Sequence, residues 1–160
     1  FVYAAALNTS AERKQPAVTL ASSLVDEPTT FVFNNKKYEP ANYHDAYYGN
    51  VTIRQALLKS LNIPTIKTAE AAGYETVAKL ARAAGIRSTV YGTPSLALGS
   101  YEIPPIEIAE AYTIFANEGN HVKRNWVTGI RDRKNRTVFT HKPEMNQALD
   151  NSAVPLKRAS

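Results

Sequence analysis

Ser60 and Asn62 are the two residues of this sequence whose types and spacing best suit chemistry. A hydroxyl can donate and accept a proton, and a carboxamide can hold the carbonyl group of a ligand. The pair lies where one expected helix ends and the next, with Pro64 in its first turn, begins. We therefore expect both side chains on one rigid corner that faces a cleft. Taken alone, the pair has a simpler explanation, because Ser and Asn often close helix ends through local hydrogen bonds.

Helices must position this corner. Thr52 followed by Gln55 forms a capping box, which predicts that a helix starts there and covers 53–60. A second helix, which Asn62 is expected to cap, follows at once, and an amphipathic third helix covers 75–85. The corner is thus predicted between two short helices, with Leu61 packed on the opposite side.

The rest of the pattern is also mostly helical, with small hairpins. We expect a helix over 1–7, a hairpin over 29–38, a tyrosine-rich loop over 40–50, a helix from 104 to about 117 and a hairpin over 126–140. In the helix from 104, the spacing of Ile108, Ala111, Tyr112 and Phe115 predicts a buried stripe.

Composition narrows the possible functions. The chain of 160 residues contains no cysteine, which excludes disulfides, thiolate nucleophiles and Cys-ligated zinc. His44, His121 and His141 are isolated, so we expect no metal site, and the absence of a Gly-rich phosphate loop favours no cofactor.

The net charge of +5 does not by itself indicate a nucleic-acid partner. The basic residues over 131–136 lack interleaved aromatic residues that would stack on bases, so we interpret them as a solvated hairpin tip and expect no nucleic acid. No apolar run is long enough to span a bilayer.

The surroundings of the Ser60 corner match a known pattern. Val51-Thr52-Ile53-Arg54-Gln55-Ala56-Leu57 precedes it, and Asn42-Tyr43 and Tyr48-Gly49 lie upstream. Three further segments follow downstream in order: Pro94-Ser95-Leu96-Ala97-Leu98-Gly99, the run from Ile103 to Tyr112, and Phe115-Ala116-Asn117-Glu118-Gly119. Together these segments resemble the transpeptidase domain of class A penicillin-binding proteins.

The resemblance implies roles for the corner. In that family a Ser-x-x-Lys serine is acylated, a Ser-x-Asn motif assists, and a Lys-Thr-Gly strand holds the substrate. Ser60 would pass a proton to the leaving amine, and Asn62 would bind a substrate carbonyl and hold the motif lysine. The partners implied are D-Ala-D-Ala stem peptides of peptidoglycan and beta-lactams, and the location implied is the extracytoplasmic face of a bacterial inner membrane, with the parent protein anchored upstream.

Two of the three motifs are missing from this chain. No Ser precedes a Lys by three residues, and Lys67-Thr68-Ala69 lacks the glycine of Lys-Thr-Gly. We expect residues 1–160 to be a fragment of one transpeptidase domain, cut just behind its nucleophile and inactive alone. The expected fold class is α+β and helix-dominated: the helical subdomain of the beta-lactamase/transpeptidase-like fold with small β-hairpins, its central sheet largely missing. The surface that the sheet would cover should be apolar and could allow self-association.

Two alternative functions and one question about nearby tyrosines remain open at this point. The chain could be a non-catalytic helical binding module of the same fold, which a Ser-x-x-Lys motif upstream in the parent would argue against. A carboxypeptidase or beta-lactamase of the same fold is less favoured, because the 94–119 segment follows the class A pattern. Tyr43, Tyr47 and Tyr48 could line a substrate groove, but packing under a loop is the more common role of such residues, and they are left out of the site.

Overall fold

The structure is a computed structural model, and it describes residues 1–12 and 18–150. Its helices are α1 (Val2–Glu12), α2 (Ile53–Lys59), α3 (Asn62–Ala72), α4 (Tyr74–Ala83) and α5 (Pro105–Ala116), with short 3-10 helices η1 (Tyr43–Asp45) and η2 (Pro94–Leu98). Its strands are β1 (Ser23–Asp26), β2 (Phe31–Phe33), β3 (Lys36–Tyr38), β4 (Gly49–Thr52), β5 (Asn120–Val122), β6 (Gly129–Arg131), β7 (Thr137–Thr140) and β8 (Met145–Gln147).

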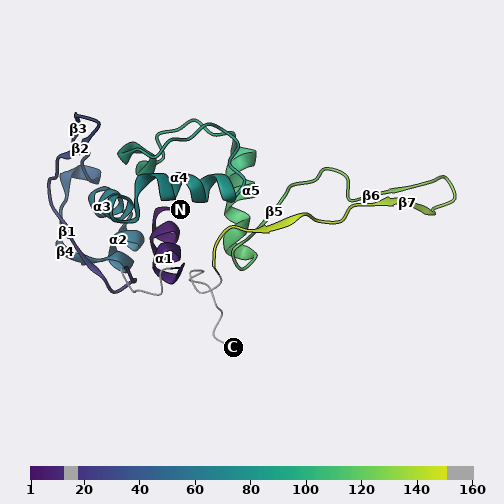
Figure 1. Ribbon diagram of the computed structural model, residues 1–160, viewed down its shortest axis with the longest axis horizontal. Helices are drawn as coiled ribbons and strands as arrows, with labels where there is room; N and C mark the ends of the chain where they lie inside the picture. The colour runs from purple at the N-terminus through teal and green to yellow at the C-terminus, as the bar shows by residue number, and fades with distance from the viewer. Residues whose placement is uncertain (13–17, 151–160) are drawn as a thin grey trace.

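The molecule consists of a helical body from which one long two-stranded arm projects (Figure 1). The strands form four separate antiparallel pairs, β1–β4, β2–β3, β5–β8 and β6–β7, and no larger sheet occurs within the described residues. The helix-dominated α+β fold with small hairpins is thereby confirmed for the described part of the chain. Within that part, no helix combines the length and apolar character that a bilayer crossing requires.

The core lies where α1, α3 and α4 meet. Small residues dominate the contact, and Ala5, Ala69, Ala78 and Ala84 are at most 1% exposed. Side chains this small let helix axes approach closely, so three short helices can share one core. α3 buries Ile63, Pro64, Ile66, Thr68 and Ala69 and packs against α1 and α4, and α2 ends just before its N-terminus (Figure 1).

The loop predicted over 40–50 contains more structure than expected. Its last residues begin β4, which pairs with β1 in the register Val25–Asn50 and Asp26–Gly49. The sequence did not reveal this strand, because four residues carry little periodicity and the partner strand lies far back in the chain. The pairing fixes the start of α2, because Ile53 N–H donates to Ser22 O at 2.9 Å.

The predicted stripe on α5 is wrong in part. Ala111 is buried, but Ile108 and Tyr112 are 37% and 58% exposed, and α5 instead buries Glu107, Glu110 and Ile114. The carboxylates can be buried because partners surround them: Ser88 N–H and Arg87 N–H donate to Glu107 at 2.9 Å. The apolar side of α5 is partly covered by Phe1, whose ring centroid lies 5.4 Å from that of Tyr112.

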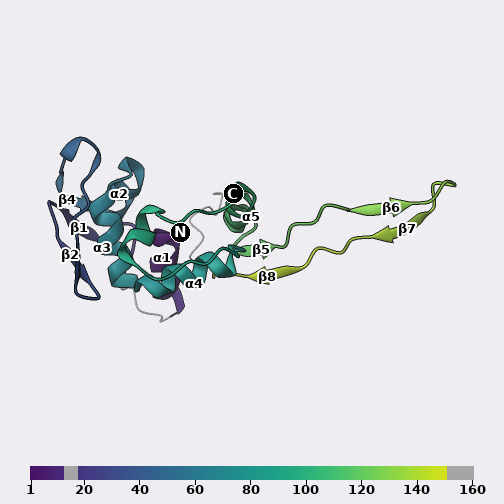
Figure 2. The same cartoon turned by 90° about the horizontal axis from the view of Figure 1, so that it is seen from above.

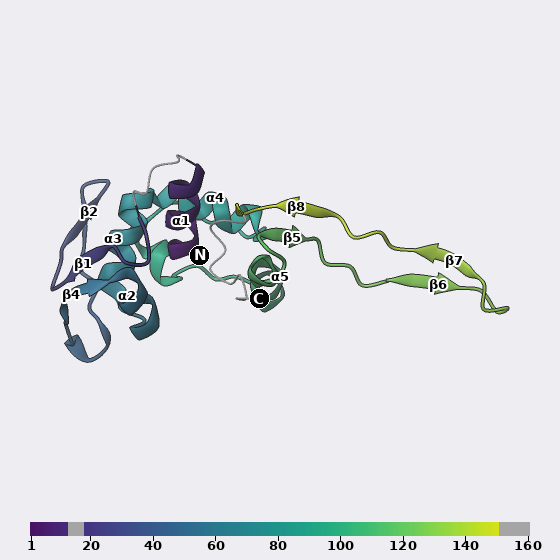
Figure 3. The same ribbon diagram turned by 90° about the horizontal axis from the view of Figure 1, so that it is seen from below.

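The hairpin predicted over 126–140 is present as β6–β7, with strands shorter than expected and an irregularity between Ile130 and Arg131. Together with β5–β8 it forms the arm, defined here as residues 120–147, which projects away from the helices in three views (Figures 1, 2 and 3).

Candidate active-site corner

Ser60 is the residue at which α2 ends. Its backbone adopts the left-handed conformation, with φ 54° and ψ 46°, and its N–H donates to the carbonyls of Ala56 and Leu57. A residue with a Cβ pays about 1–2 kcal/mol for this conformation, and glycine is the usual choice at such a helix end. The Ser60 side chain is exposed. A strained, exposed hydroxyl at a position that favours glycine is the kind of outlier that occurs at functional sites.

Leu61 anchors the corner to the hydrophobic core. It is 5% exposed and packs with Val51 and Ala56, with Tyr3 of α1 against the same cluster. The Tyr3 hydroxyl bonds to Thr65 Oγ1 at 2.7 Å, and burial raises the pKa of Tyr3. The expectation that Leu61 packs away from the site is confirmed, and the buried leucine separates two neighbours that are not buried.

Asn62 begins α3 but does not cap it, contrary to the sequence prediction. The N-cap position is Leu61, which makes no side-chain cap bond, and the cap comes instead from Asn42, twenty residues upstream. Asn42 Oδ1 accepts from Asn62 N–H at 2.9 Å and from Ile63 N–H at 3.2 Å. This external cap leaves the Asn62 side chain free of capping, and its Nδ2 donates to Ala41 O at 2.7 Å.

Asn42 is itself held by a buried carboxylate. Its Nδ2 donates to Asp26 Oδ1 at 2.7 Å and to Ala46 O at 2.9 Å, while Tyr48 N–H donates to Asp26 Oδ2 at 3.0 Å. Asp26 is 1% exposed and Asn42 is 5% exposed. The corner is therefore tied to the β1–β4 pair through a fully bonded polar network, which holds a unique geometry more strictly than apolar packing does.

The three tyrosines near the corner differ in role. Tyr47 packs on the cluster of Phe31, Ile63 and Ile66, whereas Tyr43 is 83% exposed. Tyr48 is half exposed, and Lys59 Nζ lies 3.9 Å from the centre of its ring. The residue that precedes Ser60 thus holds its cation over the ring of Tyr48, a residue that the sequence analysis left out of the site.

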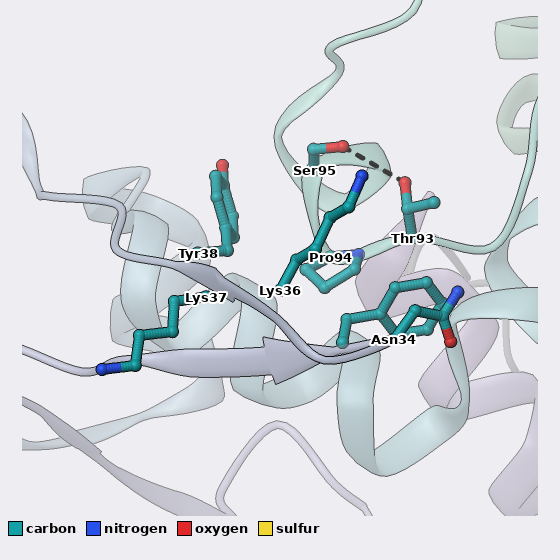
Figure 4. A pocket seen from close by; sticks show the side chains of 8 residues that line it. Asn34, Lys36, Lys37, Tyr38, Thr93, Pro94 and Ser95 are labelled. Carbon is teal, nitrogen blue, oxygen red and sulfur yellow. Dashed lines mark hydrogen bonds between the residues drawn. The ribbon is translucent and has the colours of Figure 1, made fainter.

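One pocket of the body lies away from the corner. A pocket of about 310 Å³ lies between the β2–β3 hairpin and η2, where Figure 4 shows Lys36 and Ser95 above Pro94. Phe33 lines it and packs edge-on against Tyr74, beyond the C-terminal end of α3, whereas the corner is at the N-terminal end. Within residues 1–12 and 18–150, no group of three or more His, Asp or Glu is placed to hold a metal ion.

Sequence reasoning missed Asn42 and Asp26 as parts of the site. Asn42 belongs to a segment whose resemblance to the family was noted, but a single Asn in a loop gives no sign of which helix it will cap. In the sequence, an Asp beside Glu27 and Pro28 looks like a turn residue, and nothing local signals that it will be buried.

The comparisons with known proteins agree on the family. Residues 16–156 match the family described as penicillin binding protein transpeptidase domain. Penicillin-binding protein 2D of Bacillus subtilis is 32% identical over 144 residues, covering 88% of this chain and 21% of that protein. Penicillin-binding protein 1A of Haemophilus influenzae is 31% identical over 147 residues, covering 91% of this chain and 16% of that protein.

Solved structures show the same relationship. The crystal structure of penicillin-binding protein 1A from Haemophilus influenzae superimposes with a TM-score of 0.77 at 30% identity, over 90% of this chain and 21% of that one. An imipenem acyl-enzyme complex of penicillin-binding protein A from M. tuberculosis shares the fold, with a TM-score of 0.75 at 17% identity over 96% of this chain and 40% of that one. The chain spans about a fifth of the length of its curated relatives. The chain belongs to the penicillin-binding protein transpeptidase family.

Proposed function

We propose that residues 1–160 form part of one domain of a peptidoglycan D,D-transpeptidase, in which Ser60 and Asn62 are the assisting pair. The proposal rests mainly on the exposed Ser60 hydroxyl, which a residue in the left-handed conformation presents. The neighbouring Asn62 side chain does not cap α3, and the family match covers most of the chain.

The reaction needs a nucleophile that the parent protein supplies from its Ser-x-x-Lys motif. That serine loses its proton as its oxygen attacks the carbonyl of the penultimate D-Ala, the peptide C–N bond breaks, and the departing D-Ala amine takes up a proton. The amine of a neighbouring strand then loses a proton as it attacks the acyl ester, the ester C–O bond breaks, and the serine oxygen takes up a proton again. Ser60 delivers the proton to the leaving amine, because a hydroxyl accepts one proton while it donates another.

The Asn62 carboxamide has capacity for the two tasks assigned to it. One of its two N–H hydrogens donates to Ala41 O, which fixes the direction of the group. The second hydrogen is available for a substrate carbonyl, and Oδ1 can accept from the ammonium of the motif lysine. Beta-lactams would enter as mimics of the D-Ala-D-Ala end. Penicillin-binding protein A from M. tuberculosis, which shares the fold, forms an acyl-enzyme complex with the beta-lactam imipenem.

The experiment is covalent labelling of the full-length parent by a fluorescent penicillin. We expect Ser60→Ala to slow labelling by about 10²–10⁴-fold, the usual contribution of a positioned proton-transfer group. Ser100→Ala is the matched control, because Ser100 is also exposed but lies in the loop after η2, and it should label at the parental rate. The 160-residue chain alone should not be labelled, since it lacks Ser-x-x-Lys. Labelling of the isolated chain would mean that the nucleophile has been misplaced.

A parent that is not labelled at all would favour the alternative, a non-catalytic helical binding module. We further propose that the parent is anchored in the inner membrane and works on its extracytoplasmic face, where peptidoglycan is cross-linked. Protease accessibility in intact spheroplasts tests this location.

We also propose that the isolated chain self-associates through exposed apolar side chains of α2 and α5. Leu57 and Leu58 are 50% and 76% exposed, and Ile106 is 44% exposed. Sedimentation velocity should show dimers or larger species that Leu58→Glu reduces, and a monomer at all concentrations would contradict this.

A further inference from the structure

The arm carries the whole excess charge of the protein. Residues 120–147 contain seven Lys or Arg and two Asp or Glu, a net charge of +5, which equals the net charge of the chain. The other residues therefore balance, with twelve cations and twelve anions. Charge of one sign, concentrated on one projecting element, attracts a partner of the opposite sign over distances of about a Debye length.

The base of the arm is fixed to the body. His121 Nε2 bonds to Glu110 Oε1 at 2.8 Å, and Arg124 lies 3.3 Å from Glu110 Oε2, with the Glu110 side chain 2% exposed. The amides of Ala148 and Leu149 donate to Gly119 O at 2.9 and 3.0 Å, and Leu149 is buried. These contacts fix the orientation of the arm relative to the helical body.

The outer part of the arm is apolar as well as basic. Trp126 is 79% exposed, and the cross-strand pair Ile130 and Phe139 is 51% and 45% exposed. Four cations, Arg131, Arg133, Lys134 and Arg136, lie at or next to the turn, with Asp132 pairing to Arg136 at 2.7 Å. Exposed large apolar residues beside a charged group are typical of a binding surface rather than of a solvated loop.

The strands β6 and β7 leave their outer edges open. Among the described residues they pair only with each other, and apart from Gly129 and Arg131 they consist of Ile, Thr, Val and Phe, which favour strands and do not block edge pairing. An open edge can accept a third strand through main-chain hydrogen bonds.

We propose that the arm binds an acidic, extended segment of a partner protein, which adds as a strand to the β6–β7 pair and contacts the basic turn. A lipid surface is less suited, because acyl chains offer no hydrogen-bonding groups to the open main-chain edges of a two-stranded ribbon. This binding is separate from the proposed transpeptidase chemistry, since no arm residue belongs to the Ser60 corner.

The test uses the full 160-residue chain and its intrinsic reporter, because Trp126 is the sole tryptophan. The probe is a capped octapeptide of alternating Glu and Val. We expect a saturable blue shift of Trp126 emission that weakens as salt rises, and loss of binding with the same peptide N-methylated on alternate amides. Equal binding of the N-methylated peptide would overturn strand addition.

Charge-reversal variants distinguish binding by the arm from general charge attraction by the body. Arg131→Glu, Arg133→Glu and Lys134→Glu together should weaken binding about tenfold or more, with unchanged helical circular dichroism. The matched control reverses three exposed cations of the body, Lys36, Lys37 and Arg54, and should bind within about twofold of the parent. Equal losses in both variants, no saturable shift with the Glu-Val peptide, or a shift only with phosphatidylglycerol vesicles would each overturn the proposal.

Discussion

Replacing Asn42 with Ala should lower the free energy of unfolding of this protein strongly. Asn42→Ala removes the acceptor of two N–H groups at the start of α3 and the donor to Asp26 and Ala46. Asn62 is partly exposed, so water can replace the lost partner of its N–H. Ile63 and Asp26 are 0% and 1% exposed, so their groups are left without a partner.

The magnitude follows from those two buried groups. Each buried group that loses its partner costs about 1–3 kcal/mol, so the two together cost about 2–6 kcal/mol in the free energy of unfolding. We expect about 3 kcal/mol, because Asp26 keeps its bond from Tyr48 N–H. For a domain of this size, 1 kcal/mol corresponds to roughly 2–4 °C, so the melting temperature should fall by about 6–12 °C. Asn146→Ala, at an exposed position of the arm, is the control and should stay within about 0.5 kcal/mol of the parent.

The assay is urea unfolding followed by circular dichroism, together with penicillin labelling of the parent protein carrying the same change. Asn42→Asp keeps an acceptor for α3 but replaces the donor to Asp26 with a second carboxylate, so at neutral pH it should not rescue stability. A loss below about 1 kcal/mol in Asn42→Ala would mean that the network does not hold the corner. An Asn42→Asp variant as stable as the parent would mean the same.

Three other changes test separate parts of the structure. Ser60→Gly removes the strain of the left-handed conformation and should raise the free energy of unfolding by about 0.5 kcal/mol after the backbone entropy of glycine is subtracted. Ser60→Ala should give no such gain. Equal melting temperatures of the two variants would show that Ser60 is not strained. The backbone N–H of Ser88 is the largest cause that lowers the pKa of Glu107, so this group adds stability above its unfolded pKa that is lost as pH falls through the folded value. Acid unfolding below about pH 4.5 should therefore be less steep in Glu107→Gln, and an unchanged slope would rule this out. Gly85→Ala places a Cβ 2.6 Å from His121 Nε2 on a backbone with φ +108°. It should lower the free energy of unfolding, measured with a chemical denaturant, by about 2 kcal/mol or more. An unchanged stability would mean that His121 can move away without cost.

The sequence predicted the elements that rest on local interactions. The capping box at Thr52 and Gln55 is present with both of its bonds, and α2 ends one residue before the predicted end. The hairpins around Asn34 and near Asp132 are also in place, because turn residues and strand formers act over a few positions. Side-chain burial on α5 could not be predicted the same way, since a carboxylate is buried only where a folded neighbour supplies donors.

By itself, the sequence determined the family, the helix-rich fold and the position of Ser60 and Asn62 at a bend between two helices, because these follow from short-range propensities and from motif order. Only the tertiary structure decided what holds that bend: Asn42 reaches α3 from the loop before β4, and Asp26 orients Asn42 from β1. It also decided that the basic turn stands at the end of an anchored arm. Contacts of this kind join residues far apart in the chain, and their partners are chosen by how the elements pack rather than by any local pattern.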